Sequence, residues 1–363
     1  MRPSRKPLSH HDVVIVCEGS TTEYNYFCEI RDFITQNITS PTFSSILVIP
    51  SNTDAVKSKS GRKTREMAPD ASQWRYYMLS EDNENDYQEY RAQPVRYVRE
   101  AELFLLKKNY DEAWAVYDWD EKPGQNQKKH SKVQPILQRN QGRLFVAFSS
   151  YSFEEWILAH FERNTKKFST SDCSDILGHS YMCGSASADT QYDCHGEKCI
   201  AGYLREQGYI PIYSKSDKNL FSTYTLKEGK VSRKAIFNAS WLRFKGSRFS
   251  SDAYTDVDYL VSKLIDDNYC CEWFSLGESF SFSGTNLQID KDGTLLKVKN
   301  IGKMSFVLTS SNISLTDANG DKNHSVLSGN IIIQPGEDYS VSITEAFSVL
   351  RLTNRNKDYF IEI

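Results

Sequence analysis

The chain has 363 residues, of which 39% are hydrophobic and 13% aromatic, and this length and composition predict two domains with substantial cores. A mean hydropathy of -0.55, with no apolar run of roughly 18 residues, excludes a transmembrane helix. The formal net charge of -3 does not by itself indicate a nucleic-acid binder, although it averages over local patches.

The N-terminal segment predicts a cytoplasmic protein. Met1–Lys6 is basic, as in the n-region of a signal peptide, but the apolar segment Val13–Cys17 is too short for an h-region and continues into Glu18. We therefore expect no export signal and no membrane association. In such a chain the eight cysteines are expected to be reduced or to bind metal, because disulfides persist in oxidising compartments.

Apolar runs and helical spacing then alternate along the first half of the chain. Runs rich in β-branched residues predict buried strands at 13–17, 45–49, 112–117 and 143–148. Helical spacing predicts helices at 22–36, 95–108, 133–139 and 153–163. The polar segment at about 51–90 predicts an insertion or lid. The alternation as a whole predicts an α/β fold, with a mostly parallel sheet flanked by helices.

The pattern of apolar residues changes from about Trp273 onward. Short alternating runs at 295–298, 305–308, 330–333 and 349–352 are separated by Gly, Asn and Asp turns, and helical spacing disappears. This pattern predicts a small C-terminal all-β sandwich. The predicted domains are 1–272, which would carry the catalytic site, and 273–363, which would be a binding module.

Four acidic residues stand at or just beyond the ends of predicted strands. They are Glu18 after the first strand, Asp118 and Asp120 after the third, and Glu154 past the fourth. In open α/β sheets, ligands bind beyond the carboxyl ends of the strands. Clustered carboxylates repel one another unless a cation neutralises them, so we expect Mg²⁺ or Mn²⁺ at this edge. The chemistry predicted for such a site is metal-assisted cleavage of a phosphodiester.

Each of these acids also has a structural interpretation. An Asp at a strand end often caps a turn or the next helix, so the triplet Asp118-Trp119-Asp120 is a weak signal on its own. Its combination with Glu18 and Glu154 is more specific. Glu23, one turn into the first predicted helix, is either a further ligand or an acid that is favourable near a helix N-terminus.

Three segments of the chain resemble motifs of the RloB-like family. Residues 15–27 (IVCEGSTTEYNYF) are similar to its opening motif, roughly vCEGxxTExxYF. Residues 152–161 (SFEEWILAHF) are similar to its xFExWxxxHF motif. Tyr213-Ser214-Lys215, followed by 235–239, is similar to its C-terminal part. The resemblance covers roughly residues 12–245 and does not include the β-rich tail.

The resemblance implies a Toprim-like catalytic domain, related to those of OLD-type nucleases. The family is found with bacterial restriction and phage-defence loci, often beside an ABC-type ATPase. On this chain the resemblance implies that Glu18 is the Toprim glutamate and that Asp118 and Asp120 are the metal-binding pair. Glu154 would be an additional acidic ligand, and Lys215 would neutralise charge on the phosphate. The insertion and the tail depart from a minimal family member, so the resemblance does not specify substrate or regulation.

Residues 215–248 form a basic stretch, with nine Lys or Arg side chains against two acidic ones. Cations contact phosphates and aromatic rings stack on unpaired bases, so this stretch predicts nucleic-acid contact. The alternative is a helix with a solvated basic face over an aromatic core. The residues expected to contact nucleic acid are Lys215, Lys218, Lys230, Arg233 and Lys234, and the interleaved aromatics are Tyr213, Phe221, Tyr224, Trp241 and Phe244.

Four cysteines, with two histidines among them, lie close together in the sequence and suggest zinc. They contain no CxxC pair, which structural zinc sites usually have, so the spacing favours reduced thiols over a metal site. The residues are Cys173, Cys183, Cys194 and Cys199, with His179 and His195.

The function that these observations predict is a divalent-metal nuclease acting on RNA, with tRNA among the candidates, or on DNA, as an effector of anti-phage defence. Glu18 would act as general base or metal ligand. A sugar transferase can also use a DxD motif, but the motif around Glu18 and the basic stretch argue against it. A phosphatase with Asp118 as nucleophile would have Thr two residues beyond Asp120, where Lys122 stands.

The non-enzymatic alternative is a nucleic-acid-binding or sensor subunit on a Toprim scaffold. In either case the β-rich tail is expected to bind a partner ATPase, a phage protein or another copy of the chain. The sequence alone does not choose among these partners or define the oligomeric state.

Overall fold

The computed structural model describes residues 11–38, 43–50, 94–118, 126–173, 183, 194–227, 230–248, 252–265, 269–318, 320, 323–327, 329–343 and 347–363. The predicted insertion at about 51–90 lies outside these residues, as do Trp119 and Asp120 of the acidic triplet. The side chain of Lys230 is also outside the description.

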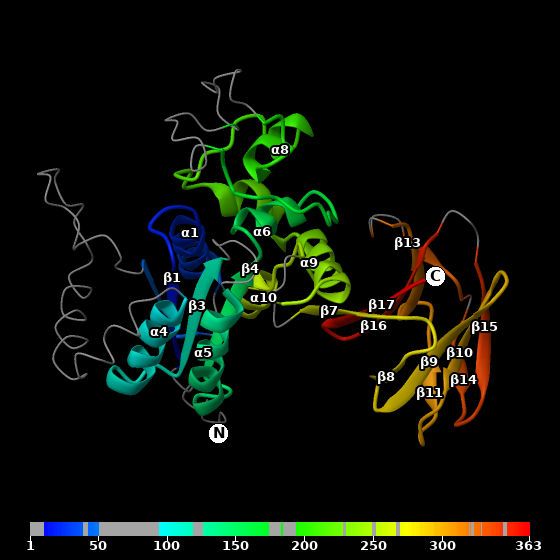
Figure 1. The fold of residues 1–363 in the computed structure, drawn as a ribbon. Helices are drawn as coiled ribbons and strands as arrows, with labels where there is room; N and C mark the ends of the chain where they lie inside the picture. The colour runs from blue at the N-terminus through cyan, green and yellow to red at the C-terminus, as the bar shows by residue number, and fades with distance from the viewer. Residues whose placement is uncertain are drawn as a thin grey trace, which may run out of the picture.

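A four-stranded sheet forms the centre of the N-terminal part, in the order β2-β1-β3-β4 (Figure 1). All three neighbouring pairs run parallel. This sheet confirms the predicted α/β fold, and each strand lies within one residue of its predicted range. The strands are β1 (Asp12–Cys17), β2 (Ser45–Pro50), β3 (Glu112–Asp118) and β4 (Leu144–Ser149).

The two faces of this sheet pack against different helices, because successive side chains of a strand point to opposite faces. Ile15 and Val116 belong to a core that they share with α1, α6 and α10. Val14 and Ala115 belong to a second core that they share with α4 and α5. With both faces covered, the strands are apolar throughout. The helices are α1 (Thr22–Asn37), α4 (Val95–Lys107), α5 (Asn126–Arg139), α6 (Glu154–Ala159) and α10 (Val257–Ile265).

Two helices differ in length from their predicted ranges. Helix α5 begins at Asn126 rather than at 133, because its polar first half has no apolar spacing to reveal it. Helix α6 ends at Ala159 rather than at 163. Nδ1 of His160 lies within hydrogen-bond distance of the Trp156 carbonyl oxygen, at 2.9 Å, so the imidazole ring lies against the C-terminal end of this helix. Within the described ranges, every helix is too short or too polar to traverse a bilayer.

The segment between α6 and the tail adds to the first core. Ile200 and Leu204 of α8 and Ile236 and Ala239 of α9 are fully buried in it. A single turn of π-helix and a short hairpin connect these two helices. The elements are α8 (Ile200–Glu206), η2 (Phe221–Thr225), β5 (Leu226–Lys227), β6 (Lys230–Val231) and α9 (Arg233–Lys245).

The C-terminal part is built from sheets that are antiparallel except for one strand pair, which confirms the predicted change to β structure. Its sheets have the orders β15-β10-β9-β8, β13-β12-β16-β17-β7 and β11-β14. Leu287 and Ile289 of β9 are buried in a third core. Asn286, which precedes Leu287 on the same strand, is exposed, so the two faces of the strand differ. The strands are β8 (Ser279–Phe282), β9 (Thr285–Asp292), β10 (Leu295–Asn300), β11 (Phe306–Leu308), β12 (Ile313–Thr316), β13 (Asn323–Ser325), β14 (Ile331–Ile333), β15 (Asp338–Ser342), β16 (Val349–Asn354) and β17 (Lys357–Glu362).

Strand β7 (Cys270–Phe274) joins the two parts of the molecule. It pairs parallel with β17, so it belongs to the C-terminal sheet although it begins before the predicted boundary between 272 and 273. Trp273 of β7 packs against Phe237 of α9 and Phe360 of β17, with ring centroids 5.1 Å from each. Figure 1 shows β7 running from the region of α9 and α10 into the β-rich tail. The first core therefore extends across the connection between the two parts.

Candidate active site

Glu18 and Asp118 lie side by side at the carboxyl ends of neighbouring strands. The backbone N–H of Glu18 donates to the carbonyl of Val116 at 2.8 Å, which extends the β1–β3 ladder by one residue. The N–H of Asp118 donates to Oε2 of Glu18 at 3.0 Å. Both residues are half-buried. The edge of the sheet thus brings together two of the predicted ligands, which are 100 residues apart in the chain.

Both carboxylates are oriented by further hydrogen bonds. The hydroxyl of Tyr97, in α4, donates to Oε1 of Glu18 at 2.9 Å. The N–H of Phe153 donates to Oδ2 of Asp118 at 3.1 Å. Tyr97 is buried, and its position on an amphipathic helix carries no sequence signal beyond that of a core residue. The sequence analysis therefore missed it as a positioning residue for Glu18.

A second acidic group lies beside the first and is more deeply buried. Glu154 accepts a hydrogen bond from the hydroxyl of Tyr213 at 2.6 Å. The hydroxyl of Thr22 lies 3.4 Å from the carbonyl of Lys215. These contacts bring together the three segments that resemble RloB-like motifs, although the residues that they join are 193 and 59 positions apart in the chain.

The charges of these residues act on Glu23, which is buried in the first turn of α1. Burial raises the pKa of Glu23 to about 8, and the negative charges of Glu18 and Glu154 add to this effect, while Lys215 lowers the pKa. Glu18, Glu23, Glu154 and Lys215 are therefore close enough to interact electrostatically. Burial, together with the charge of Glu154, also raises the pKa of the Tyr213 hydroxyl well above its ordinary value.

The donor set fits a hard divalent cation. It consists of carboxylates at a strand edge, and their repulsion adds to the effect of burial in raising the pKa of Glu23. A cation bound there would relieve this repulsion, and carboxylate oxygens are the ligands that Mg²⁺ and Mn²⁺ prefer. The assignment of Glu18 and Asp118 as ligands of such an ion stays a prediction. The position of Asp120 lies outside the described residues, so its part in the site stays a prediction.

Other motif residues form a buried hydrogen-bond chain rather than a reactive group. The indole N–H of Trp156 donates to the hydroxyl of Tyr26 at 2.8 Å. That hydroxyl lies 2.8 Å from Oγ1 of Thr225, which lies 2.9 Å from Nε2 of His160. All four side chains are buried. We infer that these residues hold α1, α6 and η2 together and thereby support the acidic edge.

The basic stretch is dispersed over several environments. Lys215 is half-buried near Glu23, Lys218 is exposed, and Lys234 is half-buried. The guanidinium of Arg233 lies 3.9 Å from the centre of the Tyr269 ring. The assignment of these residues to nucleic-acid contact stays a prediction.

Part of the same stretch serves the fold instead. Arg243 forms a buried ion pair with Asp258, and Arg248 lies 3.0 Å from Asp256. Among the interleaved aromatics, Tyr213 and Phe221 are buried, so their rings are not available to stack on bases. This half of the stretch matches the alternative of a helix over an aromatic core.

The four cysteines between residues 173 and 199 come together, although the absence of a CxxC pair favoured isolated thiols. Their Sγ atoms all lie within 4.8 Å of one another. Sequence spacing misses this group because Cys173, Cys183 and Cys194 are each about ten residues apart rather than two. The cysteines are free of disulfides, as predicted, within the described part of the chain.

With this geometry described, the chain can be compared with known proteins. A family model described as RloB-like protein matches residues 13–264, more than half of the chain. The chain belongs to the RloB-like family. The match spans Glu18, Asp118, Glu154 and Lys215, and it ends before β7. No curated protein and no solved structure matches the chain.

Proposed function

We propose that this RloB-like chain is a divalent-metal-dependent nuclease with its active site at the edge formed by β1 and β3. The observation that carries the proposal is the 3.0 Å hydrogen bond from the backbone N–H of Asp118 to Oε2 of Glu18, which joins two acidic residues at adjacent strand ends. Ligands bind at this edge in open α/β sheets. The neighbouring Glu23 supports the proposal, because burial raises its pKa and the negative charges of Glu18 and Glu154 raise it further.

The residues of the site have distinct roles in this proposal. Glu18 and Asp118 would hold Mg²⁺ or Mn²⁺, with Asp120 and Glu154 as the further predicted ligands. The bound ion would supply charge stabilisation for the phosphodiester and its leaving oxygen. Tyr97 keeps the Glu18 carboxylate in place through its 2.9 Å hydrogen bond. Lys215 would contact the phosphate of the substrate, since a lysine ammonium is a mobile point charge.

The substrate and setting follow from the family resemblance. RNA, with tRNA among the candidates, or DNA would be cleaved, and the chain would act as an effector in bacterial anti-phage defence. An ABC-type ATPase would be its partner. The side chains of Lys218 and Arg233 are exposed, so they would contact a polyanion at the surface.

A cleavage assay tests this proposal directly. The full chain is incubated with total tRNA and, separately, with supercoiled plasmid, in Mg²⁺, in Mn²⁺ and in EDTA. We expect metal-dependent cleavage of one substrate class. Asp118→Asn should reduce the rate by at least about 100-fold, because it removes a charged ligand while keeping the shape of the side chain.

The matched control is Asp111→Asn at the other end of the same strand. Oδ2 of Asp111 accepts a hydrogen bond from the N–H of Asp12 at 2.8 Å, so this substitution removes a comparable carboxylate far from the proposed site. Its cleavage rate should stay near that of the wild type. Wild-type protein that cleaves neither substrate, and that matches Asp118→Asn in cells under phage challenge, would instead support a binding or sensor subunit.

A further inference from the structure

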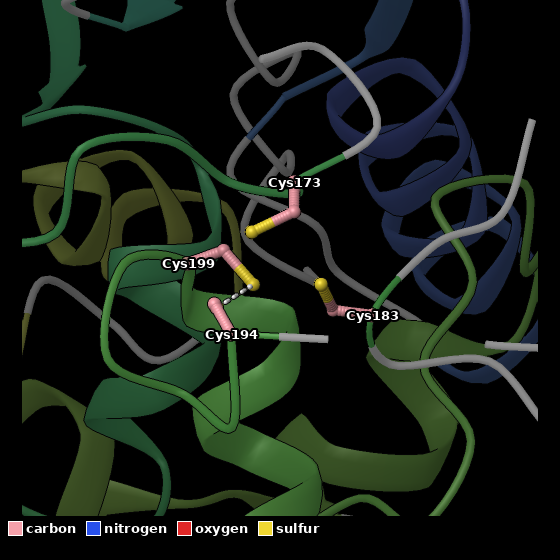
Figure 2. A group of neighbouring side chains, drawn as sticks. All are labelled: Cys173, Cys183, Cys194 and Cys199. Atoms are coloured by element: carbon pink, nitrogen blue, oxygen red, sulfur yellow. Dashed lines mark hydrogen bonds between the residues drawn. The ribbon is translucent and has the colours of Figure 1, made fainter. Parts of the chain in front are cut away.

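A cluster of four thiols lies apart from the acidic edge, in the segment that connects α6 to α8. The Sγ atoms of Cys173, Cys183, Cys194 and Cys199 all lie within 4.8 Å of one another, and those of Cys194 and Cys199 are 3.4 Å apart. Figure 2 shows the side chains of Cys173, Cys183 and Cys199 turned toward one another, with Cys194 completing the group. Three of the four are buried and Cys194 is partly exposed.

We propose that these four cysteines bind one structural zinc ion. Four thiolates around Zn²⁺ at about 2.3 Å form a tetrahedron whose sulfur atoms are about 3.8 Å apart. The observed separations bracket that value. An iron–sulfur cluster would hold its cysteines further apart, because the iron and sulfide atoms lie between them. Four protein ligands leave no open position for a substrate, so the ion would stabilise the fold and take no part in catalysis.

The loop between Cys194 and Cys199 has a backbone suited to this role. The N–H of Gly202 donates to Sγ of Cys199 at 3.2 Å, and the N–H groups of Lys198 and Cys199 donate to the Cys194 sulfur. Amide donors of this kind stabilise the thiolate form that binds metal.

Two glycines allow the close approach of this loop to α8. Gly196 has a φ of +72, and a Cβ there would lie 2.6 Å from the Cα of Tyr203. A Cβ on Gly202 would lie 3.0 Å from Sγ of Cys199 and 3.4 Å from the Cβ of Cys183. Side chains at either position would push the loop away from the thiols. The two glycines therefore allow the loop to hold the thiols close together.

The charge around the cluster also fits a metal–thiolate centre. A zinc ion with four thiolates carries a net charge of about -2, and such a centre is stable when cations lie nearby. Nζ of Lys166 donates to the carbonyl of Gly196 at 2.6 Å, and the guanidinium of Arg205 donates to the carbonyl of Cys183. Both cations thus bind the backbone of the ligand loops.

The position of the cluster indicates what the ion would stabilise. Cys199 precedes α8, whose Ile200 and Leu204 are buried in the core that also contains Trp156 and Ile157 of α6. The hydroxyls of Tyr203 and Tyr209 donate to Glu162, just after α6, at 2.8 and 2.6 Å. Zinc would therefore fix the segment that supports α6, the helix that begins with Glu154.

Metal analysis of the full chain tests the proposal. Protein produced in zinc-containing medium and purified without chelator should contain about one zinc per chain. Cys173→Ser and Cys199→Ser should each reduce that content to near zero. Cys28→Ser is the matched control, because Cys28 is a free, partly buried cysteine of α1 outside the cluster, and its zinc content should equal that of the wild type.

A second measurement does not depend on the folding of any variant. Wild-type protein stripped of zinc with a chelator and loaded with Co²⁺ should show the thiolate charge-transfer bands and intense visible bands of a tetrahedral site. Wild-type protein that contains no zinc and gives no such cobalt spectrum would overturn the proposal. Iron in place of zinc, or a zinc content unchanged in both Cys173→Ser and Cys199→Ser, would overturn it as well.

Discussion

Glu155 and its neighbour Glu154 show how the same residue type acquires different properties at adjacent positions. Glu154 accepts a hydrogen bond from Tyr213, whereas both carboxylate oxygens of Glu155 are buried without a hydrogen-bond partner among the described residues. Burial, reinforced by the charge of Glu154, raises the pKa of Glu155 well above its ordinary value. We infer that the folded state favours the protonated form of Glu155 and that this residue takes no part in holding a cation.

This protonation predicts a dependence of stability on pH. In the unfolded chain Glu155 loses its proton as the pH rises above about 4.5, whereas the folded state keeps it. The folded state then binds more protons, so the free energy of unfolding falls with rising pH, by up to about 1.4 kcal/mol per pH unit. Glu155→Gln cannot titrate and should lack this contribution.

The measurement is urea unfolding of the wild type and of Glu155→Gln between pH 5 and pH 8. The variant should gain stability relative to the wild type as the pH rises. Parallel pH profiles for the two proteins would show that Glu155 is not the group responsible.

At the scale of elements, the connection between α1, α6 and η2 depends on one buried hydroxyl. Thr225 lies 2.8 Å from the Tyr26 hydroxyl and 2.9 Å from Nε2 of His160, and it is fully buried. The π-helical turn places this side chain between the two helices. Three elements that are distant in sequence thus share a single polar contact inside the first core.

Thr225→Val removes this hydroxyl while keeping the shape of the side chain. We expect a loss of about 1–3 kcal/mol in the free energy of unfolding, because buried polar groups of Tyr26 and His160 lose a partner. Urea unfolding measures the change. Thr35→Val, at an exposed position of α1, is the control and should stay within about 0.5 kcal/mol of the wild type. A loss no larger than that of the control would contradict the role given to Thr225.

At the scale of the whole molecule, the two parts of the chain share apolar surface. Trp273 of β7 and Phe360 of β17 belong to the same core as Phe237 of α9. Trp241 of α9 also donates its indole N–H to Glu362 of β17 at 2.6 Å. The β-rich tail thus stabilises the N-terminal part in addition to any binding role that it has.

Removal of the tail should therefore impair the remaining fold. A chain truncated after residue 265 loses β7 and β17, which leaves the apolar face of α9 exposed to water. Buried aromatic side chains contribute about 1.5–3 kcal/mol each, so we expect aggregation or a loss of cooperative unfolding. Circular dichroism during thermal unfolding, compared with the full chain, measures this. A monomeric truncated chain with the same unfolding midpoint as the full chain would show that the parts are independent.

Features that depend on short segments could be predicted from the sequence. The apolar runs of β1 and β3 are long enough to identify buried parallel strands, and their ends place Glu18 and Asp118 at one edge. The switch to alternating runs after Trp273 likewise reveals the β-rich tail. Local periodicity suffices in these cases because it reflects which faces of a strand are buried. The family motifs add the neighbourhood of Glu154 and Lys215.

Features that depend on contacts between distant segments were decided only by the tertiary structure. The sequence identifies Tyr97 only as a core residue, whereas the structure shows that α4 places its hydroxyl against Glu18. Cys173 and Cys183 carry no local zinc spacing, and only the folding of their loops brings them to Cys199. The charges of Arg243 and Arg248 look available for nucleic acid until Asp258 and Asp256 pair with them. Tyr97 and Glu18 are far apart in sequence, whereas Arg248 and Asp256 are close, but in each case no local pattern encodes a contact made by chain packing.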